Sequence, residues 1–291
     1  MRVLVTGAAG FIGRHVCEAL DEAGHHVLGL DQGGVLPRSC REWMAADITK
    51  GLAPIPMLDA VIHLAAIAAP RECDRNPTLA FDVNVNGTLQ VLKMALESGA
   101  KKVVFSSSAH VYDIPPRYLP TDETHPLRLN NTYTTTKLLG EQLCHLYWEN
   151  HGLPYTTLRL YNAYGPGQAL GYFIPDQVAK AKQGPLSLSG GNTTKDWVHI
   201  ADVARAFVLA LDSHYVGAIN IGTGIETELS TIAAKIAELQ GVGFVSGDDP
   251  RATRMCANRM RAERILGWKP SISLMEGLRG LLDPAKSPAF R

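Results

Sequence analysis

A tyrosine and a lysine four residues apart are the first residues in this chain that could carry out acid–base chemistry. Tyr133 and Lys137 open a helical stretch over 133–150, where an i, i+4 pair lies on one face. A free phenol has a pKa of about 10, but a neighbouring ammonium group stabilises the phenolate and lowers that pKa. The pair therefore predicts a tyrosinate that takes a proton from a substrate hydroxyl while hydride leaves the carbon that carries this hydroxyl. The alternative is a surface tyrosine beside a solvated lysine.

Three consecutive serines could hold the same substrate oxygen. Ser106, Ser107 and Ser108 follow an apolar run at 102–106, which we expect to be a buried strand. Ligands of parallel sheets bind at the carboxyl ends of the strands, so hydroxyl groups at this position would face a ligand. A YxxxK pattern alone is frequent by chance, and it becomes specific when it follows such a strand end and a glycine loop.

The glycine loop is the segment TGAAGFIG at 6–13, between an apolar run and a helical pattern. Gly7 permits a tight turn, Gly10 lets the backbone approach a pyrophosphate, and Gly13 lets the helix pack closely on the strand. The N-terminus of the helix then directs free N–H groups and a partial positive charge at the phosphates. The alternative is that these glycines serve ordinary turns.

Asp31 identifies the dinucleotide that this loop would bind. It lies 18 residues after Gly13, at the end of the second expected strand. A carboxylate there accepts hydrogen bonds from both hydroxyls of the adenine ribose and repels a 2′-phosphate, so NAD is favoured over NADP. Asp47 and Ile48 lie where an adenine contact could be made. For both aspartates the alternative is an ordinary surface or turn carboxylate.

The elements that must hold these residues alternate between strand and helix. We expect strands at 3–5, 26–30, 61–65, 102–106, 156–160 and 218–221, and helices at 12–23, 77–98, 133–150, 229–240 and 274–282. This order predicts an α/β fold, a doubly wound parallel sheet with right-handed crossovers and helices on both faces. Loop and short helix over 168–195, together with the segments after 221, predict a smaller C-terminal α/β lid. The expected units are 1–163 plus 196–221 for the dinucleotide and 164–195 plus 222–291 for substrate, with a loose tail at 284–291.

The composition excludes several classes of protein. Lys plus Arg and Asp plus Glu both number 28, which argues against a nucleic-acid binder, and 46% hydrophobic residues predict a sizeable core. No apolar run is long enough to span a membrane, and we expect no secretory signal. The five cysteines form no CxxC pair or Cys/His cluster, so no metal site is predicted and reduced thiols in a cytoplasmic protein are expected.

Nine motifs give the chain a resemblance to a known family over roughly residues 1–283. They are TGAAGFIG (6–13), HLAA (63–66), NVNGT (84–88), FSSSAHVY (105–112), YTTTK (133–137), RLYNAYGPG (159–167), KDWVHIADVA (195–204), NIGTG (220–224) and LGWKP (266–270). With them the chain resembles the extended short-chain dehydrogenases/reductases, in particular the NAD-dependent epimerases and dehydratases that act on nucleotide sugars. The resemblance implies a Rossmann fold, bound NAD and a nucleotide-sugar substrate.

The resemblance also implies roles for individual residues. Tyr133 would be the catalytic base, Lys137 its pKa tuner and ribose ligand, and Ser108 the hydroxyl that polarises the substrate oxygen. The implied cofactor contacts are Gly7, Gly10, Phe11, Ile12, Gly13, Asp31, Asp47, Ile48, Leu64, Ala65, Ala66, Asn84, Ser106, Tyr133, Lys137 and Tyr161. The implied substrate contacts are Ser108, His110, Asn162, Lys195, Arg251 and Arg254.

The positions after Ser108 narrow the chemistry that the resemblance implies. The dehydratases carry an Asp–Glu pair where this chain has Ala109 and His110, and the decarboxylases carry Glu at the second of these positions. We therefore expect 4-epimerisation, as in UDP-glucose/UDP-galactose 4-epimerases, through transient oxidation at sugar C4. The alternatives are a 4-ketoreductase or dehydrogenase, a dehydratase and a non-catalytic dinucleotide sensor. His110 is either a pocket-wall residue or a hydrogen-bonding partner or auxiliary acid near the sugar.

Departures from the family pattern leave the substrate open. Thr132 stands where the epimerases usually have Pro, and Lys195 replaces the usual Arg, which loses a bidentate fork for phosphate. Arg251 or Arg254 could supply a phosphate contact, or both could be solvated.

The resemblance further implies a homodimer, because the family pairs two helices of each subunit in a four-helix interface. The apolar residues that we expect there are Leu79, Val83, Leu89, Leu92, Leu138, Leu143, Leu146 and Tyr147. The alternative is that both helices only cover the sheet.

Overall fold

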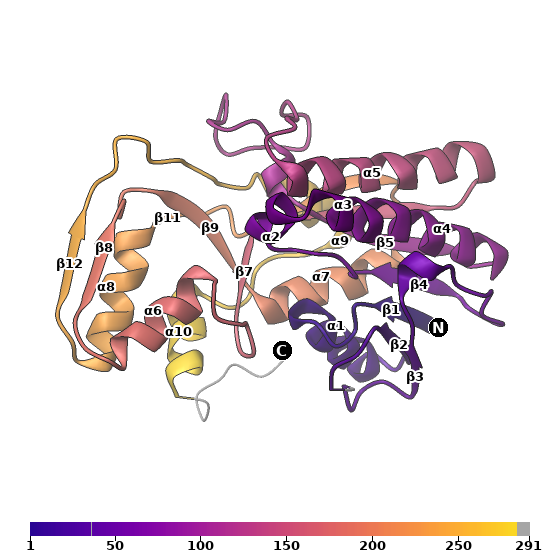
Figure 1. The fold of residues 1–291 in the computed structure, drawn as a ribbon, viewed down its shortest axis with the longest axis horizontal. Helices are drawn as coiled ribbons and strands as arrows, with labels where there is room; N and C mark the ends of the chain where they lie inside the picture. The colour runs from indigo at the N-terminus through magenta and orange to yellow at the C-terminus, as the bar shows by residue number, and fades with distance from the viewer. Residues whose placement is uncertain (36, 284–291) are drawn as a thin grey trace.

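Seven parallel strands form the main sheet of the protein, in the order β10-β6-β5-β4-β1-β2-β3 (Figure 1). The structure is a computed structural model that describes residues 1–35 and 37–283. The strands of this sheet are β1 (Arg2–Thr6), β2 (His26–Asp31), β3 (Glu42–Ala45), β4 (Ala60–His63), β5 (Lys102–Ser108), β6 (Tyr155–Leu160) and β10 (Gly217–Ile221). The doubly wound α/β fold is confirmed. The tail predicted at 284–291 lies outside the described residues.

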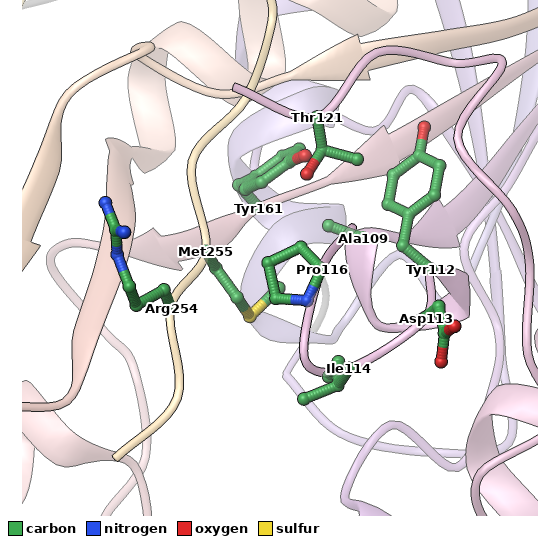
Figure 2. A pocket seen from close by; sticks show the side chains of 9 residues that line it. All are labelled: Ala109, Tyr112, Asp113, Ile114, Pro116, Thr121, Tyr161, Arg254 and Met255. Carbon is green, nitrogen blue, oxygen red and sulfur yellow. The ribbon is translucent and has the colours of Figure 1, made fainter. Parts of the chain in front are cut away.

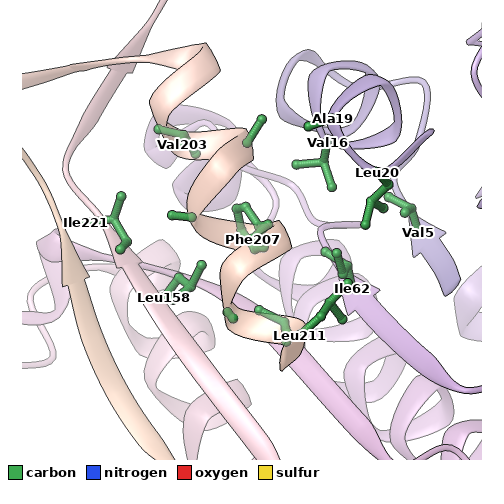
Figure 3. Packing of buried hydrophobic residues seen from close by; sticks show 14 of the residues in the cluster. Val5, Val16, Ala19, Leu20, Ile62, Leu158, Val203, Phe207, Leu211 and Ile221 are labelled. Atoms are coloured by element: carbon green, nitrogen blue, oxygen red, sulfur yellow. The ribbon is translucent and has the colours of Figure 1, made fainter. Parts of the chain in front are cut away.

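One face of the main sheet is covered by α1 (Phe11–Glu22) and α7 (Ile200–Asp212). Phe207 of α7 is completely buried among Val16 and Leu20 of α1 and the apolar side chains of the central strands (Figure 3). This packing fixes where α1 begins relative to β1, and therefore where the glycine loop lies.

The other face is covered by α4 (Gly87–Glu97) and α5 (Thr132–His151). The helix expected over 77–98 is interrupted: α3 (Pro77–Phe81) leads through a π-helical turn (Asp82–Asn86) into α4. The Thr88 hydroxyl donates to the Asn84 carbonyl oxygen at 2.6 Å and so competes with the regular backbone ladder. The short helices α2 (Pro70–Arg75), η1 (Ile48–Lys50) and η3 (Ala109–Val111) complete this half of the chain.

The smaller unit contains more strand than the sequence predicts. Its three-stranded sheet has the order β11-β9-β7, and a parallel pair joins β12 to β8. Its strands and helices are β7 (Asn162–Tyr164), β8 (Leu186–Ser189), β9 (Thr194–His199), β11 (Glu226–Glu228), β12 (Phe244–Gly247), α6 (Phe173–Ala181), α8 (Leu229–Gln240) and α10 (Leu274–Leu282). The helix α9 (Met260–Leu266) instead packs against β10 and α7 of the main sheet. The loop and short helix expected at 168–195 are therefore α6 and β8, packed around a separate apolar core.

The described residues contain neither a membrane-spanning helix nor a cluster of metal-ligating side chains. Within 1–35 and 37–283, no helix is long and apolar enough to cross a membrane. In the same part of the chain, no group of three or more His, Cys, Asp or Glu side chains is arranged to hold a metal ion.

Candidate active site

Ser108, Tyr133 and Lys137 meet at the carboxyl end of β5. Ser108 is the last residue of β5, which runs through all three serines rather than ending before them. Asn131 and Thr134 form a capping box that fixes the start of α5, so Tyr133 and Lys137 lie on its first two turns. The side chains of Ser108 and Tyr133 are hydrogen bonded, and Lys137 Nζ donates to the Ser106 carbonyl oxygen at 2.8 Å.

Burial controls the ionisation of this set. Desolvation raises the pKa of Tyr133 to about 12, although the hydrogen bond from Ser108 lowers it. Desolvation also lowers the pKa of Lys137 to about 8, and its Nζ lies 6.0 Å from the centre of the Tyr133 ring. In the free protein burial is the largest cause of the Tyr133 shift, and a phenol pKa depressed by Lys137 together with bound NAD stays a prediction. In the free protein Tyr133 is an acid that needs additional positive charge to become a base.

Cys73 is a neighbour of this site that sequence reasoning misses. It lies in α2, is completely buried, and packs with Ala80 against the Tyr133 ring. Burial raises the pKa of its thiol, and the thiol donates to the Ile67 carbonyl oxygen at 3.3 Å. A neutral thiol there helps to keep water away from the phenol. No spacing or motif in the chain marks this position.

The glycine loop has the geometry that a dinucleotide requires. Gly7 has a φ of +71°, and a Cβ on Gly13 would lie 2.0 Å from the Gly7 carbonyl oxygen. Gly10 is the N-cap of α1, and no side chain caps this helix, so the first N–H groups remain for an anion. Phe11 and Ile12 pack partly on the core below. These features fit the pyrophosphate of NAD.

Two acidic residues surround the place expected for adenosine. One Asp31 carboxylate oxygen accepts from the Ala9 N–H at 3.1 Å and the other from Gln32 N–H at 2.8 Å, at the end of β2. The Asp47 side chain caps η1, and hydrogen bonds from Thr49 lower the pKa of its carboxyl group. Ile48 is buried against Gly87 of α4, so an adenine contact by Ile48 would use its backbone.

The loop after β4 is tied to its neighbours by hydrogen bonds. Leu64 and Ala65 donate their N–H groups to Thr6 Oγ1, which places Ala65 and the following Ala66 beside the glycine loop. The Asn84 side-chain oxygen accepts from the Ile67 N–H, and its side-chain nitrogen donates to the Ile67 carbonyl oxygen and to Thr136 Oγ1. Asn84 therefore holds the loop after β4 in place, and both polar atoms of its side chain already have hydrogen-bond partners.

His110, Lys195 and Asn162 are the residues that the sequence places on the substrate side of the site. Burial, and then the charge of Lys195, lower the pKa of His110 to about 4, so this imidazole is neutral at pH 7. Lys195 Nζ donates to the Met255 sulfur at 3.2 Å, and burial lowers the pKa of this lysine. Asn162 starts β7 and donates to the Asp196 carbonyl oxygen at 3.1 Å. These groups offer a half-buried cation and two polar neutral side chains.

A cavity next to these residues distinguishes the two candidate arginines. Arg254 lines it together with Met255, Tyr161 and Tyr112 (Figure 2). Arg254 makes a two-armed ion pair with Glu226 at 2.6 Å. Arg251 is exposed and pairs with Asp249, away from this cavity lining. Tyr161, expected at the cofactor, packs with Tyr112 and Met255, and its role stays a prediction.

Comparisons with known proteins agree with this geometry. A model of the NAD dependent epimerase/dehydratase family matches residues 3–222. The chain is 35% identical to a putative UDP-glucose 4-epimerase from Methanocaldococcus jannaschii, with 98% of each protein covered. It is 28% identical to UDP-glucuronic acid decarboxylase 1 from Xenopus tropicalis, covering 95% of this chain and 70% of that protein. MoeE5 in complex with UDP-glucose and NAD superposes with a TM-score of 0.88 at 28% identity, covering 98% of this chain and 99% of that one. The fold, the glycine loop and these matches together show that the chain belongs to the NAD dependent epimerase/dehydratase family.

Proposed function

We propose that this enzyme is a nucleotide-sugar 4-epimerase. The observation that carries the proposal is the buried Ser108–Tyr133 hydrogen bond beside Lys137, followed by Ala109 and His110. Removing water or carbon dioxide from the sugar would need a further acid or base next to Ser108. Ala109 has no ionisable group, and His110 is neutral at pH 7. What the set can do is remove a proton from one hydroxyl and return it.

The proposed roles follow from the positions of the groups. Ser108 holds the substrate oxygen, Tyr133 takes and returns its proton, and Lys137 places positive charge beside the phenol. Bound NAD supplies the capacity to accept a hydride from sugar C4 and to give it back. Lys195, Asn162 and Arg254 are proposed to hold the nucleotide diphosphate, because Lys195 is a half-buried cation and Arg254 lines a cavity beside Met255, which Lys195 contacts. His110 is proposed as a neutral hydrogen-bonding partner of the sugar.

Turnover without added cofactor tests this function. Purified protein is incubated with a panel of UDP-, dTDP- and GDP-sugars, and stereoisomers are separated by chromatography. A 4-epimerase converts at least one sugar to its C4 epimer while its bound NAD shows no net change, because the hydride returns within each cycle. Net consumption of added NAD(H) would identify a ketoreductase or dehydrogenase instead. NAD binding without any conversion would identify a dinucleotide sensor.

The organisation of the chain is part of the proposal. Residues 1–163 plus 196–221 are proposed to bind NAD, and residues 164–195 plus 222–291 to bind the sugar nucleotide. The proposed NAD contacts are the cofactor residues predicted from the sequence between Gly7 and Ser106. Among them, Asn84 acts by holding the loop after β4 through Ile67. We also propose a cytoplasmic location, since all five cysteines are free and buried.

We propose a homodimer that uses the outer faces of α4 and α5. Leu89 of α4 and Leu146 of α5 are 37% and 49% exposed, whereas Leu92, expected at the same interface, is buried in the core. Light scattering at micromolar concentration is expected to give the mass of a dimer for the natural chain and of a monomer for Leu89→Glu/Leu146→Glu. A charge placed in an apolar interface loses its water without gaining a partner.

A matched control for the dimer is Val245→Glu. Val245 of β12 is 67% exposed in the smaller unit, away from both helices, so this variant should keep the dimer mass. A monomeric natural chain would contradict the dimer, and a double variant that keeps the dimer mass would contradict an interface on α4 and α5.

A further inference from the structure

A buried ion pair lies directly beneath the candidate active site. Ser107 of β5 and Arg159 of β6 are register partners on neighbouring strands, and Glu141 of α5 reaches both of them. Glu141 Oε1 accepts from Ser107 Oγ at 2.5 Å and from Arg159 Nε at 3.0 Å, while Oε2 accepts from Arg159 Nη2 at 2.7 Å. All three residues are buried. One carboxylate therefore joins a helix to two strands.

On the strand side of this junction, Ser107 lies between Ser106 and Ser108, the two residues of β5 that the active site uses. The Ser107 side chain points toward α5, where its hydroxyl donates to Glu141, and Ser106 and Ser108 are its neighbours along β5. The Ser106 carbonyl oxygen receives Lys137, and the Ser108 side chain meets Tyr133. Holding Ser107 therefore holds both of these neighbours.

The helix end of the junction lies on the same face as the catalytic candidates. Tyr133, Lys137 and Glu141 follow each other at four-residue intervals, so they form one stripe along α5. Between them, a Cβ on Gly140 would lie 2.5 Å from the Phe105 ring, which shows how closely the helix approaches the strand. Close apolar contact brings α5 onto the sheet, but it does not by itself fix how far the helix slides along the strand.

The junction continues across the sheet. Arg159 Nη1 donates to the Tyr112 hydroxyl oxygen at 3.1 Å, and the Tyr112 hydroxyl donates to Asn220 Oδ1 at 2.6 Å. Asn220 of β10 is the register partner of Arg159. Ser107, Arg159 and Asn220 thus form a polar row across three strands, and Glu123 extends it by accepting from Arg159 and from the Asn220 N–H. Because burying charge is costly and apolar side chains could fill this space, such a row is suited to specifying one arrangement.

From this geometry we infer that Glu141, Ser107 and Arg159 are positioning residues for the reaction. Their junction sets the register of α5 on β5 and so holds Tyr133 and Lys137 against Ser108 and the Ser106 carbonyl. The inference rests on the catalytic roles proposed above for Ser108, Tyr133 and Lys137. A misplacement of the order of 1 Å at a reacting group can cost about 100-fold in rate, so a loosened junction should slow hydride transfer while substrate and NAD still bind.

The test uses Ser107→Ala, which removes one hydrogen bond and leaves the ion pair intact. Removing Glu141 instead would leave Arg159 buried and unpaired, and the protein could fail to fold. The matched control is Thr157→Val: Thr157 lies two residues before Arg159 on the same strand and is buried, and its hydroxyl has no hydrogen-bond partner. Backbone hydrogen exchange over 102–108 and 132–141 reports the register. Single-turnover reduction of bound NAD by sugar nucleotides, KM and NAD content report the chemistry.

We expect Ser107→Ala to speed exchange at the start of α5 and to slow hydride transfer about tenfold or more, with KM and NAD content unchanged. Thr157→Val should match the natural chain in every measurement. Unchanged exchange in Ser107→Ala would overturn the inference, as would a rate loss accompanied by equal changes in KM or NAD content. Tyr133→Phe separates the two proposals: if it still transfers hydride, the proposed catalytic set is wrong, while the exchange data decide the register on their own.

Discussion

Replacing Tyr133 by phenylalanine is expected to reduce turnover by about 10²- to 10⁴-fold, the usual contribution of a positioned acid–base group. The change removes one hydroxyl and keeps the ring that packs against Cys73 and Ala80. Ser108 then remains as the hydroxyl at the reacting oxygen, and it has no means of holding the proton. The measurement is the rate of epimer formation in the assay without added cofactor. The content of bound NAD is determined on the same sample.

NAD content should stay unchanged in Tyr133→Phe, because the glycine loop and Asp31 lie on other elements. Tyr155→Phe is the matched control. Tyr155 is also a buried tyrosine, but it begins β6 at the amino end of the sheet, away from Ser108. Its loss should leave turnover as it is. If Tyr133→Phe retained turnover within a few-fold of the natural chain, another group would have to be the base.

The features that sequence predicts well are those set by neighbours along the chain. The glycine loop, the Tyr133–Lys137 pair and the helix at 229–240 each depend on spacing within one segment, and the structure places them as expected. The family motifs extend this to Ser108, since they locate it at the end of β5. Local spacing therefore supplies most of the candidate site.

Other features depend on pairing between distant segments, and spacing does not reveal them. The Ser107–Glu141–Arg159 junction exists because β5 and β6 pair in one register and α5 crosses both. Cys73 reaches the Tyr133 ring only through the packing of α2 on α5.

The pKa of Tyr133 shows the same limit for an energetic quantity. The residue types predict a phenol made acidic by a lysine, yet the degree of burial decides the direction of the shift. Burial is a property of the assembled fold, so no pair of residue names could have given it.

Gly13→Ala is expected to destabilise the protein and to weaken its hold on NAD. The added Cβ would lie 2.0 Å from the Gly7 carbonyl oxygen and 2.8 Å from the Ala8 Cα atom, and both of these are backbone atoms that cannot rotate away. To relieve the clash, α1 must move off the loop, which disturbs the core contacts of Val16 and Leu20. Overpacking of this kind costs about 1–3 kcal/mol. The free energy of unfolding in urea and the NAD content after gel filtration measure the two effects.

The two effects have one cause, so they should appear together. The N–H groups that would bind the pyrophosphate belong to the same first turn of α1 that the new methyl group displaces. Gly247→Ala is the control, because a Cβ at Gly247 meets no atom within 4 Å and lies on β12, remote from the loop. That variant should unfold and retain NAD like the natural chain. The prediction would be contradicted if Gly13→Ala had the stability and the NAD content of the natural chain. The glycine loop would then accommodate the methyl group, and the close approach of α1 to Gly7 would not be required for cofactor binding.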